Sequence, residues 1–175
     1  MTTRENKLHI LNTAQMRSTR NGLDAGTRQG SLEVLNRVVV DLIDATLAAR
    51  QAHWNVRGNN FSSLHELFEK VAVELSEPTD RLAERAAALG GIVRGTAQAV
   101  ASETRLKPYP ALSVSGDEHI EAISARLASL GSSIRESIQE REQSGDPVTL
   151  DHLIEAGAVV DKLLWLVESH IAKLQ

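Results

Sequence analysis

The chain has 175 residues, enough for one domain with a substantial core and too few for two ordinary domains. Apolar residues make up 42% of it and aromatic residues only 3%, a balance that favours packed helices over a β-sandwich. Because the chain has no cysteine, disulfides and thiolate sites are excluded, and any metal ligands must be His, Asp or Glu. No segment approaches the roughly 20 apolar residues that span a bilayer, and the N-terminus lacks a signal-peptide pattern, so we expect a cytoplasmic protein.

The charge is distributed unevenly along the chain. The formal net charge of −4 at pH 7 argues against a globally basic nucleic-acid binder. The first thirty residues are nevertheless rich in basic side chains, which are Arg4, Lys7, Arg17, Arg20 and Arg28. We therefore expect residues 1–30 to form a basic, partly disordered arm and residues 31–175 to form one acidic helical domain.

Two long helices are predicted in the first half of this domain. Apolar residues recur at three- and four-residue steps over 31–50, so the first helix covers this range and continues to His53 or beyond. Turn-forming residues at 55–60 separate it from a second apolar pattern over 61–89, which a glycine pair ends. Pro78 lies inside the second pattern and predicts a kink there, because proline lacks a backbone N–H and clashes with the preceding turn.

A long connection follows the second helix. Residues 91–114 include Gly95, Pro108 and Pro110 and cannot form one regular helix. They are predicted to form a crossover that contains a short helix near 96–102. A crossover of this length allows the helices that it joins to run parallel.

Two further helices are predicted after the crossover. Ser115 and Glu118 have the spacing of a capping box at the start of the third helix, and Asp146 before Pro147 is typical of an N-cap at the start of the fourth. The predicted buried stripe of the fourth helix is Leu150, Leu153, Ile154, Gly157, Val160, Leu164, Val167 and Ile171. Four long helices with one long crossover predict an all-α, ferritin-like four-helix bundle.

The second helix carries two pairs of candidate metal ligands at i, i+4 spacing, His65 with Glu69 and Asp80 with Glu84. At ~100° per residue all four project from one face of the helix. Glu69 and Asp80 are nevertheless about 16 Å apart along the axis, too far to share a site within one chain. The alternative is a solvated face, on which the two later carboxylates pair with neighbouring arginines.

A second copy related by a two-fold axis removes this separation. Both candidate pairings across such an axis, Glu69 with Asp80 and His65 with Glu84, are centred on the same point between residues 74 and 75. One symmetry axis would therefore assemble two equivalent clusters. His53, near the end of the first helix, would complete each cluster. Imidazole and carboxylate ligands suit iron, manganese or zinc better than copper(I), and a redox function would select iron.

Several separated segments resemble the signature of the Dps family of miniature ferritins. They are QAHWNVRGNNF at 51–61, LHE at 64–66, DRLAER at 80–85, LGG at 89–91 and DKLLW at 161–165. The likeness covers roughly residues 30–170 and agrees in both content and order. It implies a hollow dodecamer with a ferroxidase centre at each two-fold interface.

The resemblance also implies roles for individual residues. One subunit would supply His53, His65 and Glu69 to each centre, and its partner would supply Asp80 and Glu84. The centre would oxidise Fe²⁺, preferentially with hydrogen peroxide rather than dioxygen, and the cavity would store ferric oxide, which limits oxidative damage. Zinc is the alternative occupant of the site. Glu69 departs from the aspartate of many relatives, so the coordination geometry is expected to shift.

Two further roles follow from the resemblance. Trp54, next to a candidate ligand, is either an electron donor or an ordinary core or interface residue. Asp146, Asp151 and Glu155 match the acidic residues that line the three-fold pores through which iron reaches the cavity. Asp146 is equally well explained as a helix cap alone.

DNA binding is the competing function. In this hypothesis the basic residues of the arm neutralise phosphates across many subunits, which would make the protein nucleoid-associated. The arm has few basic residues, however, and the acidic body would repel a duplex. The sequence therefore leaves DNA binding as an alternative to iron oxidation or an addition to it.

Overall fold

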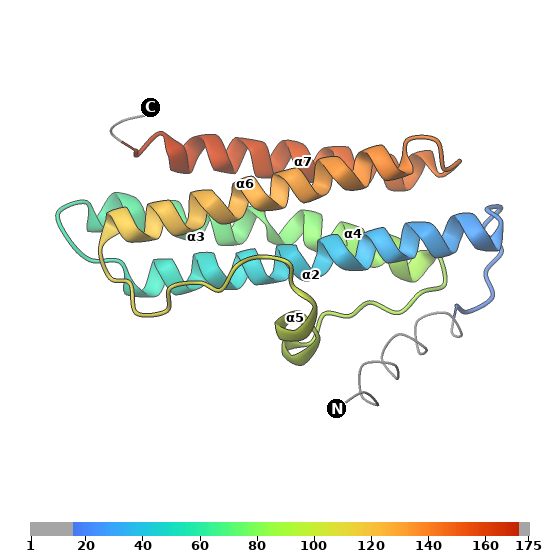
Figure 1. Ribbon diagram of the computed structural model, residues 1–175, viewed down its shortest axis with the longest axis horizontal. Helices are drawn as coiled ribbons and strands as arrows, with labels where there is room; N and C mark the ends of the chain where they lie inside the picture. Colours follow the sequence, from blue (N-terminus) through green and yellow to red (C-terminus); the bar gives the residue numbers. More distant parts are fainter. Residues whose placement is uncertain (1–15, 172–175) are drawn as a thin grey trace.

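The computed structural model of the protein describes residues 16–171, and the regular elements of this part of the chain are all helices. Its helices are α2 (Ala25–Asn55), α3 (Phe61–Glu74), α4 (Ser76–Ala88), α5 (Ala97–Glu103), α6 (Gly116–Arg141) and α7 (Pro147–Glu168). The long helices lie lengthwise beside one another, with α3 and α4 following one another end to end behind α2 and α6, and α5 lies to the side (Figure 1). The predicted ferritin-like bundle with a crossover is confirmed. None of the described helices has the length and apolar character needed to cross a membrane.

The helix α2 is the most enclosed element. It contacts α3 and α4 on one side, α6 on another, and α5 of the crossover. Consecutive residues Val38, Val39 and Val40 are all buried, as expected for a helix that is covered on several sides. Asp41 is also buried, and its carboxylate accepts hydrogen bonds from the backbone and guanidinium of Arg105 at 2.6–2.9 Å. This ion pair, in which the carboxylate is buried and the Arg105 side chain is 36% exposed, holds the crossover against α2.

The start of α2 differs from the prediction. The helix begins at Ala25, because the carboxylate of Asp24 accepts a hydrogen bond from the backbone N–H of Thr27 at 3.0 Å and so caps the first turn. Residues 25–30, assigned to the arm from the sequence, are therefore helical. The apolar pattern did not reveal this turn, since it contains two glycines and no large apolar residue.

The disturbance predicted at Pro78 is present as a break between α3 and α4. The two helices are separated at Leu75, and Pro78 has no N–H to donate to the carbonyl of Glu74. Thr79 strengthens the next turn, because its backbone N–H and its hydroxyl both donate to the carbonyl of Leu75, at 3.3 and 2.7 Å. The break lies at the point on which the sequence centred the two-fold axis.

The predicted caps of the last two helices are confirmed. The Ser115 hydroxyl accepts from the backbone N–H of Glu118 at 3.3 Å, and the Glu118 side chain accepts from the backbone N–H of Ser115. Asp146 caps α7 by accepting from the backbone N–H of Thr149 at 3.1 Å, and Pro147 is the first residue of the helix.

The buried face of α7 is only partly the predicted one. Leu153 and Val167 are buried as expected, but Ile154 is 50% exposed, so its assignment to the core was wrong. Leu163 is fully buried, whereas Leu164 is only partly covered. Because α7 carries large apolar side chains on its outer face as well, spacing alone could not select the face that packs on the bundle.

Asp146 also connects α7 to two other helices. Its carboxylate accepts from Arg85 of α4 at 2.6 Å and from the Ser31 hydroxyl of α2 at 2.7 Å. Burial disfavours the charged form, but hydrogen bonds from Thr149 and Ser31, together with the charge of Arg85, outweigh it and hold the pKa of Asp146 below its usual 3.8. The network anchors α4 at Arg85, the residue that follows the candidate ligand Glu84.

Replacing Asp146 should destabilise the fold strongly. We expect Asp146→Ala to lower the free energy of unfolding by about 3 kcal/mol, because it leaves the largely buried charge of Arg85 without a partner. The matched control is Asp24→Ala at the exposed cap of α2, which should cost clearly less. Urea unfolding followed by circular dichroism measures both losses, and equal losses would contradict the role given to the buried network.

The same network predicts a defined pH dependence. The folded-state pKa of Asp146 lies below 3.8, so the ionised carboxylate contributes its full stability above that pH and loses it as the pH falls through the folded value. The difference in unfolding free energy between wild type and Asp146→Asn should therefore be constant at neutral pH and shrink below about pH 3.8. A difference that stays constant in acid would show that Asp146 is not held ionised.

Candidate functional site

Two histidines face each other where α2 ends and α3 begins. The rings of His53 and His65 stack with their centroids 3.7 Å apart and their planes inclined by 22°. Nδ1 of His53 donates to the backbone carbonyl of His65 at 2.8 Å, and Nδ1 of His65 donates to the carbonyl of His53 at 2.7 Å. Because a carbonyl only accepts, each Nδ1 carries a proton, so that in the neutral form of each ring the lone pair is on Nε2. This is how a metal-binding histidine is commonly oriented.

The loop between the two helices creates this reciprocal arrangement. Gly58 has a φ of 117°, a left-handed conformation that favours glycine, and its carbonyl accepts from the N–H of Phe61 at 3.1 Å. Arg57 donates its N–H to the carbonyl of Val114 at 2.9 Å and so ties the loop to the end of the crossover. The Phe61 ring stacks on His65 with centroids 5.0 Å apart. The histidines are therefore held by backbone and ring contacts together.

Glu69 of α3 lies beside this pair. Its Oε2 atom is 3.3 Å from Nε2 of His53 and accepts a hydrogen bond from the guanidinium of Arg50. The hydrogen bond from Arg50 is the largest cause of a lowered pKa for Glu69; burial opposes it, and the charges of Arg50 and the histidines add to it. The carboxylate is thus kept ionised at neutral pH.

Arg50 was not identified from the sequence. The signal that could have found it is its position three residues before His53, which places both side chains on one face of α2.

The distance between Nε2 of His53 and Oε2 of Glu69 is compatible with two ligands of one ion. With metal–ligand bonds of about 2.1 Å and an angle between about 90° and 109° at the metal, the two ligand atoms lie roughly 3.0–3.4 Å apart. The observed separation between Nε2 and Oε2 is 3.3 Å. An imidazole nitrogen with a carboxylate oxygen also suits the chemistry of ferrous iron.

The remaining candidate ligands lie elsewhere in the chain. Asp80 and Glu84 are exposed on α4, beyond the break at Leu75. Among residues 16–171, no three His, Asp or Glu side chains are arranged to hold a metal ion. A single chain therefore brings His53 and Glu69 together with His65 but does not add the two carboxylates of α4.

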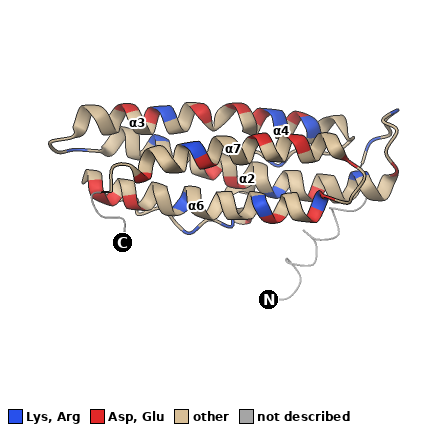
Figure 2. Ribbon diagram, turned by 90° about the horizontal axis from the view of Figure 1, so that it is seen from above, with Lys and Arg blue, Asp and Glu red and all other residues tan. Residues whose placement is uncertain are grey.

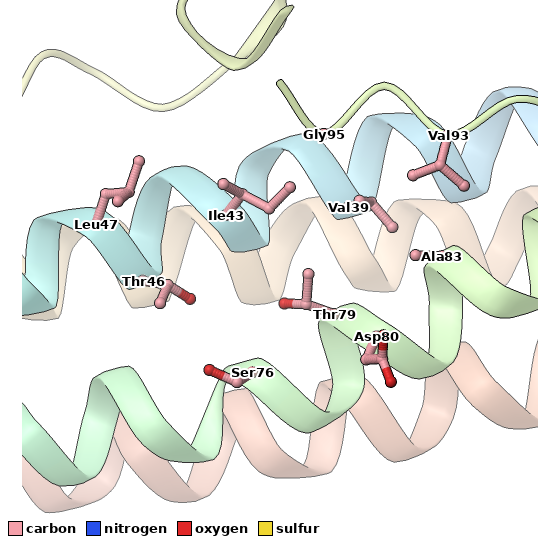
Figure 3. A pocket seen from close by; sticks show the side chains of 10 residues that line it. All are labelled: Val39, Ile43, Thr46, Leu47, Ser76, Thr79, Asp80, Ala83, Val93 and Gly95. Atoms are coloured by element: carbon pink, nitrogen blue, oxygen red, sulfur yellow. The ribbon is translucent and has the colours of Figure 1, made fainter. Parts of the chain in front are cut away.

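Asp80 borders an open groove of about 520 Å³ between α2, α4 and the crossover (Figure 3). Ile43 and Leu47 of α2 and Val93 of the crossover give the groove a largely apolar lining. Leu47 is among the large apolar side chains that this single chain leaves exposed. The groove thus combines an apolar surface with a candidate metal ligand.

The three acidic residues predicted to line a pore have different environments. Asp146 is 2% exposed and its carboxylate is already paired with Arg85, so the helix cap is confirmed. Asp151 is exposed on α7, and Glu155, one turn later, pairs with Arg81. The pore role of all three stays a prediction, and any ion that reached Asp146 would have to compete with the guanidinium.

The structure describes Trp54 and three of the five basic residues of the arm. Trp54 is 67% exposed at the end of α2, which excludes a place in the core of the single chain. Arg17 and Arg20 are exposed, whereas Arg28 is partly buried and donates to the carbonyl of Leu89 at 3.1 Å. Two further basic residues, Arg4 and Lys7, lie outside the described residues.

Figure 2 shows that acidic and basic residues are interspersed along the long helices. No observation on the described residues specifically favours DNA binding, which stays a prediction.

Comparison with known proteins adds independent information. The ferritin-like domain family matches residues 32–175. The DNA protection during starvation protein of Agrobacterium fabrum is 35% identical over 153 residues, covering 87% of this chain and 94% of that protein. DpsC from Streptomyces coelicolor superposes with a TM-score of 0.87 at 25% identity, covering 92% of this chain and 94% of its own.

Dps from Microbacterium arborescens, in a structure described as the high iron form, has a TM-score of 0.79 at 27% identity and covers 86% of this chain and 97% of its own. The fold, the matched domain and the identity to these proteins agree along most of the chain. The chain therefore belongs to the ferritin-like domain family and, within it, to the Dps proteins.

Proposed function

We propose that this protein is a ferroxidase and iron store that oxidises Fe²⁺ at sites shared between two subunits. The observation that carries the proposal is the His53, His65 and Glu69 group, in which reciprocal backbone hydrogen bonds leave Nε2 of both rings available and put one of them 3.3 Å from a carboxylate oxygen. Membership of the Dps family supports a protective, iron-binding function, and the high iron form of the Microbacterium arborescens protein is consistent with it.

In this proposal Asp80 and Glu84 come from the partner subunit. The separation of Glu69 and Asp80 along the helix, about 16 Å, argues against one chain holding all the ligands. A two-fold axis near Leu75 would bring both missing carboxylates to the histidine pair and would produce two sites for each dimer.

The groove beside Asp80 supports the same arrangement. The groove has a volume of about 520 Å³ and a largely apolar lining that includes the exposed Leu47. The second subunit would cover this apolar surface. Further copies would close the dimers into the hollow dodecamer proposed for the store, with Asp151 and Glu155 at the pores that admit iron.

The residues of the chain contribute to the chemistry by binding and charge. Fe²⁺ is the substrate, and each ion gives up one electron to the oxidant, so that a peroxide molecule consumes two ferrous ions and two protons and yields water. Carboxylates favour the more highly charged ferric product, and neutral Nε2 atoms hold the ion without adding charge. We propose that peroxide is the preferred oxidant and that Trp54 can supply an electron from its exposed position beside His53.

Removing the ligands of α4 should abolish iron oxidation. In stopped-flow measurements on metal-stripped protein, Asp80→Ala/Glu84→Ala should slow oxidation more than about 100-fold, because even residues behind metal ligands are worth about 10- to 100-fold. The matched control, Glu136→Ala/Glu140→Ala, removes two exposed carboxylates of α6, a helix that carries none of the candidate ligands, and should leave the rate unchanged. Oxidation by the ligand variant at the wild-type rate, with either peroxide or dioxygen, would refute the assignment.

Mixing two inactive variants tests whether the site is shared. His53→Ala/His65→Ala subunits lack one half of every site, and Asp80→Ala/Glu84→Ala subunits lack the other. When both are co-assembled at random, about a quarter of the wild-type sites should regain a full ligand set, since each mixed dimer contains one complete and one empty site. The recovered oxidation should match this fraction. Co-assembled protein as inactive as either variant alone would argue for a site within one chain.

A further inference from the structure

Arg50 occupies an unusual position in the candidate site. Its guanidinium donates to Oε2 of Glu69, the same atom that lies 3.3 Å from Nε2 of His53. One carboxylate oxygen therefore meets both a fixed cation and a candidate metal ligand. A further cation bound at this oxygen of Glu69 would have to compete with the guanidinium.

Stability of the fold does not explain this ion pair. The side chains of Arg50 and Glu69 are 33% and 40% exposed, and an ion pair with this much solvent contact contributes little to folding. Its effect falls on the site instead, because an arginine keeps its charge at every pH at which proteins are folded. Any metal ion that approaches Glu69 meets a permanent positive charge.

The charge of the proposed shared site points to the consequence. Three carboxylates, from Glu69 and from Asp80 and Glu84 of the partner subunit, together with the guanidinium of Arg50, leave a net charge of two minus. One ferrous ion neutralises this charge. A second would give the site two excess positive charges and would compete with Arg50 for the same oxygen of Glu69.

We propose that Arg50 takes the place of a second cation, so that each site binds one ferrous ion and excludes a second. This inference rests on the proposed function, because it uses the carboxylates assigned to the shared site. Arg50 is a positioning and specificity-determining residue in this account: it pairs with Glu69 and limits the number of ions.

Metal stoichiometry tests the inference without measuring activity. The intact, metal-stripped assembly is titrated by calorimetry with Zn²⁺, a redox-inert probe. The number of ions bound at the site is the number that wild type binds minus the number that Asp80→Ala/Glu84→Ala binds. Wild type should bind about one such ion per subunit, and Arg50→Gln should bind about two, since the competing charge is gone. Arg50→Lys, which keeps the charge, should stay near one.

Arg37→Gln is the matched control. Arg37 also lies on α2 and pairs with an exposed carboxylate, that of Glu140, with side-chain exposures of 42% and 44%. This variant should bind zinc as wild type does. Two site ions in wild type, or one in a folded Arg50→Gln assembly, would overturn the role of Arg50 while leaving the shared site intact. If Asp80→Ala/Glu84→Ala bound as many zinc ions as wild type, the shared site itself would be overturned, and the inference with it.

Discussion

The burial of α2 on several sides is the constraint on which the rest of the molecule depends. Each helix of a four-helix bundle packs on two neighbours, yet the consecutive residues Val38, Val39 and Val40 of α2 are all buried, which requires cover from beyond the bundle. The crossover with α5 provides the additional cover, and the buried carboxylate of Asp41 fastens it through Arg105. An interior charge of this kind is tolerated because it is paired and hydrogen-bonded. The end of α2 that carries His53 is consequently fixed relative to the crossover and to α3.

Local chemistry made much of the fold predictable. The capping box at Ser115, the cap at Asp146 and the break near Pro78 each follow from a few neighbouring residues, and all three are present. Features that depend on tertiary packing were harder to predict. The exposure of Ile154 is set by which neighbours cover α7, and a helix with apolar side chains on two faces does not contain that information in its spacing.

The same difference between what the sequence predicts and what it does not is found in the candidate site. The sequence predicted that His53, His65 and Glu69 lie in one cluster, and the structure brings the three side chains together, because a short loop joins the two helices that carry them. The assignment of Asp80 and Glu84 depends on a second chain, which the fold of one chain does not contain. Arg50 escaped notice because an arginine on a helix surface is ordinarily a solvated residue, and only the geometry of Glu69 distinguishes this one.

The acceptors of the two histidine hydrogen bonds are backbone carbonyls, and this limits how substitutions can change the site during evolution. In a metal centre where a side chain orients the ring, a single substitution can reverse which nitrogen carries the proton. Here the partner of each ring is the main chain at the other histidine, which no substitution removes. Substitutions in the surrounding residues can therefore change the affinity of the proposed metal site, while the proton of both rings stays on Nδ1 as long as the path of the backbone between α2 and α3 is kept.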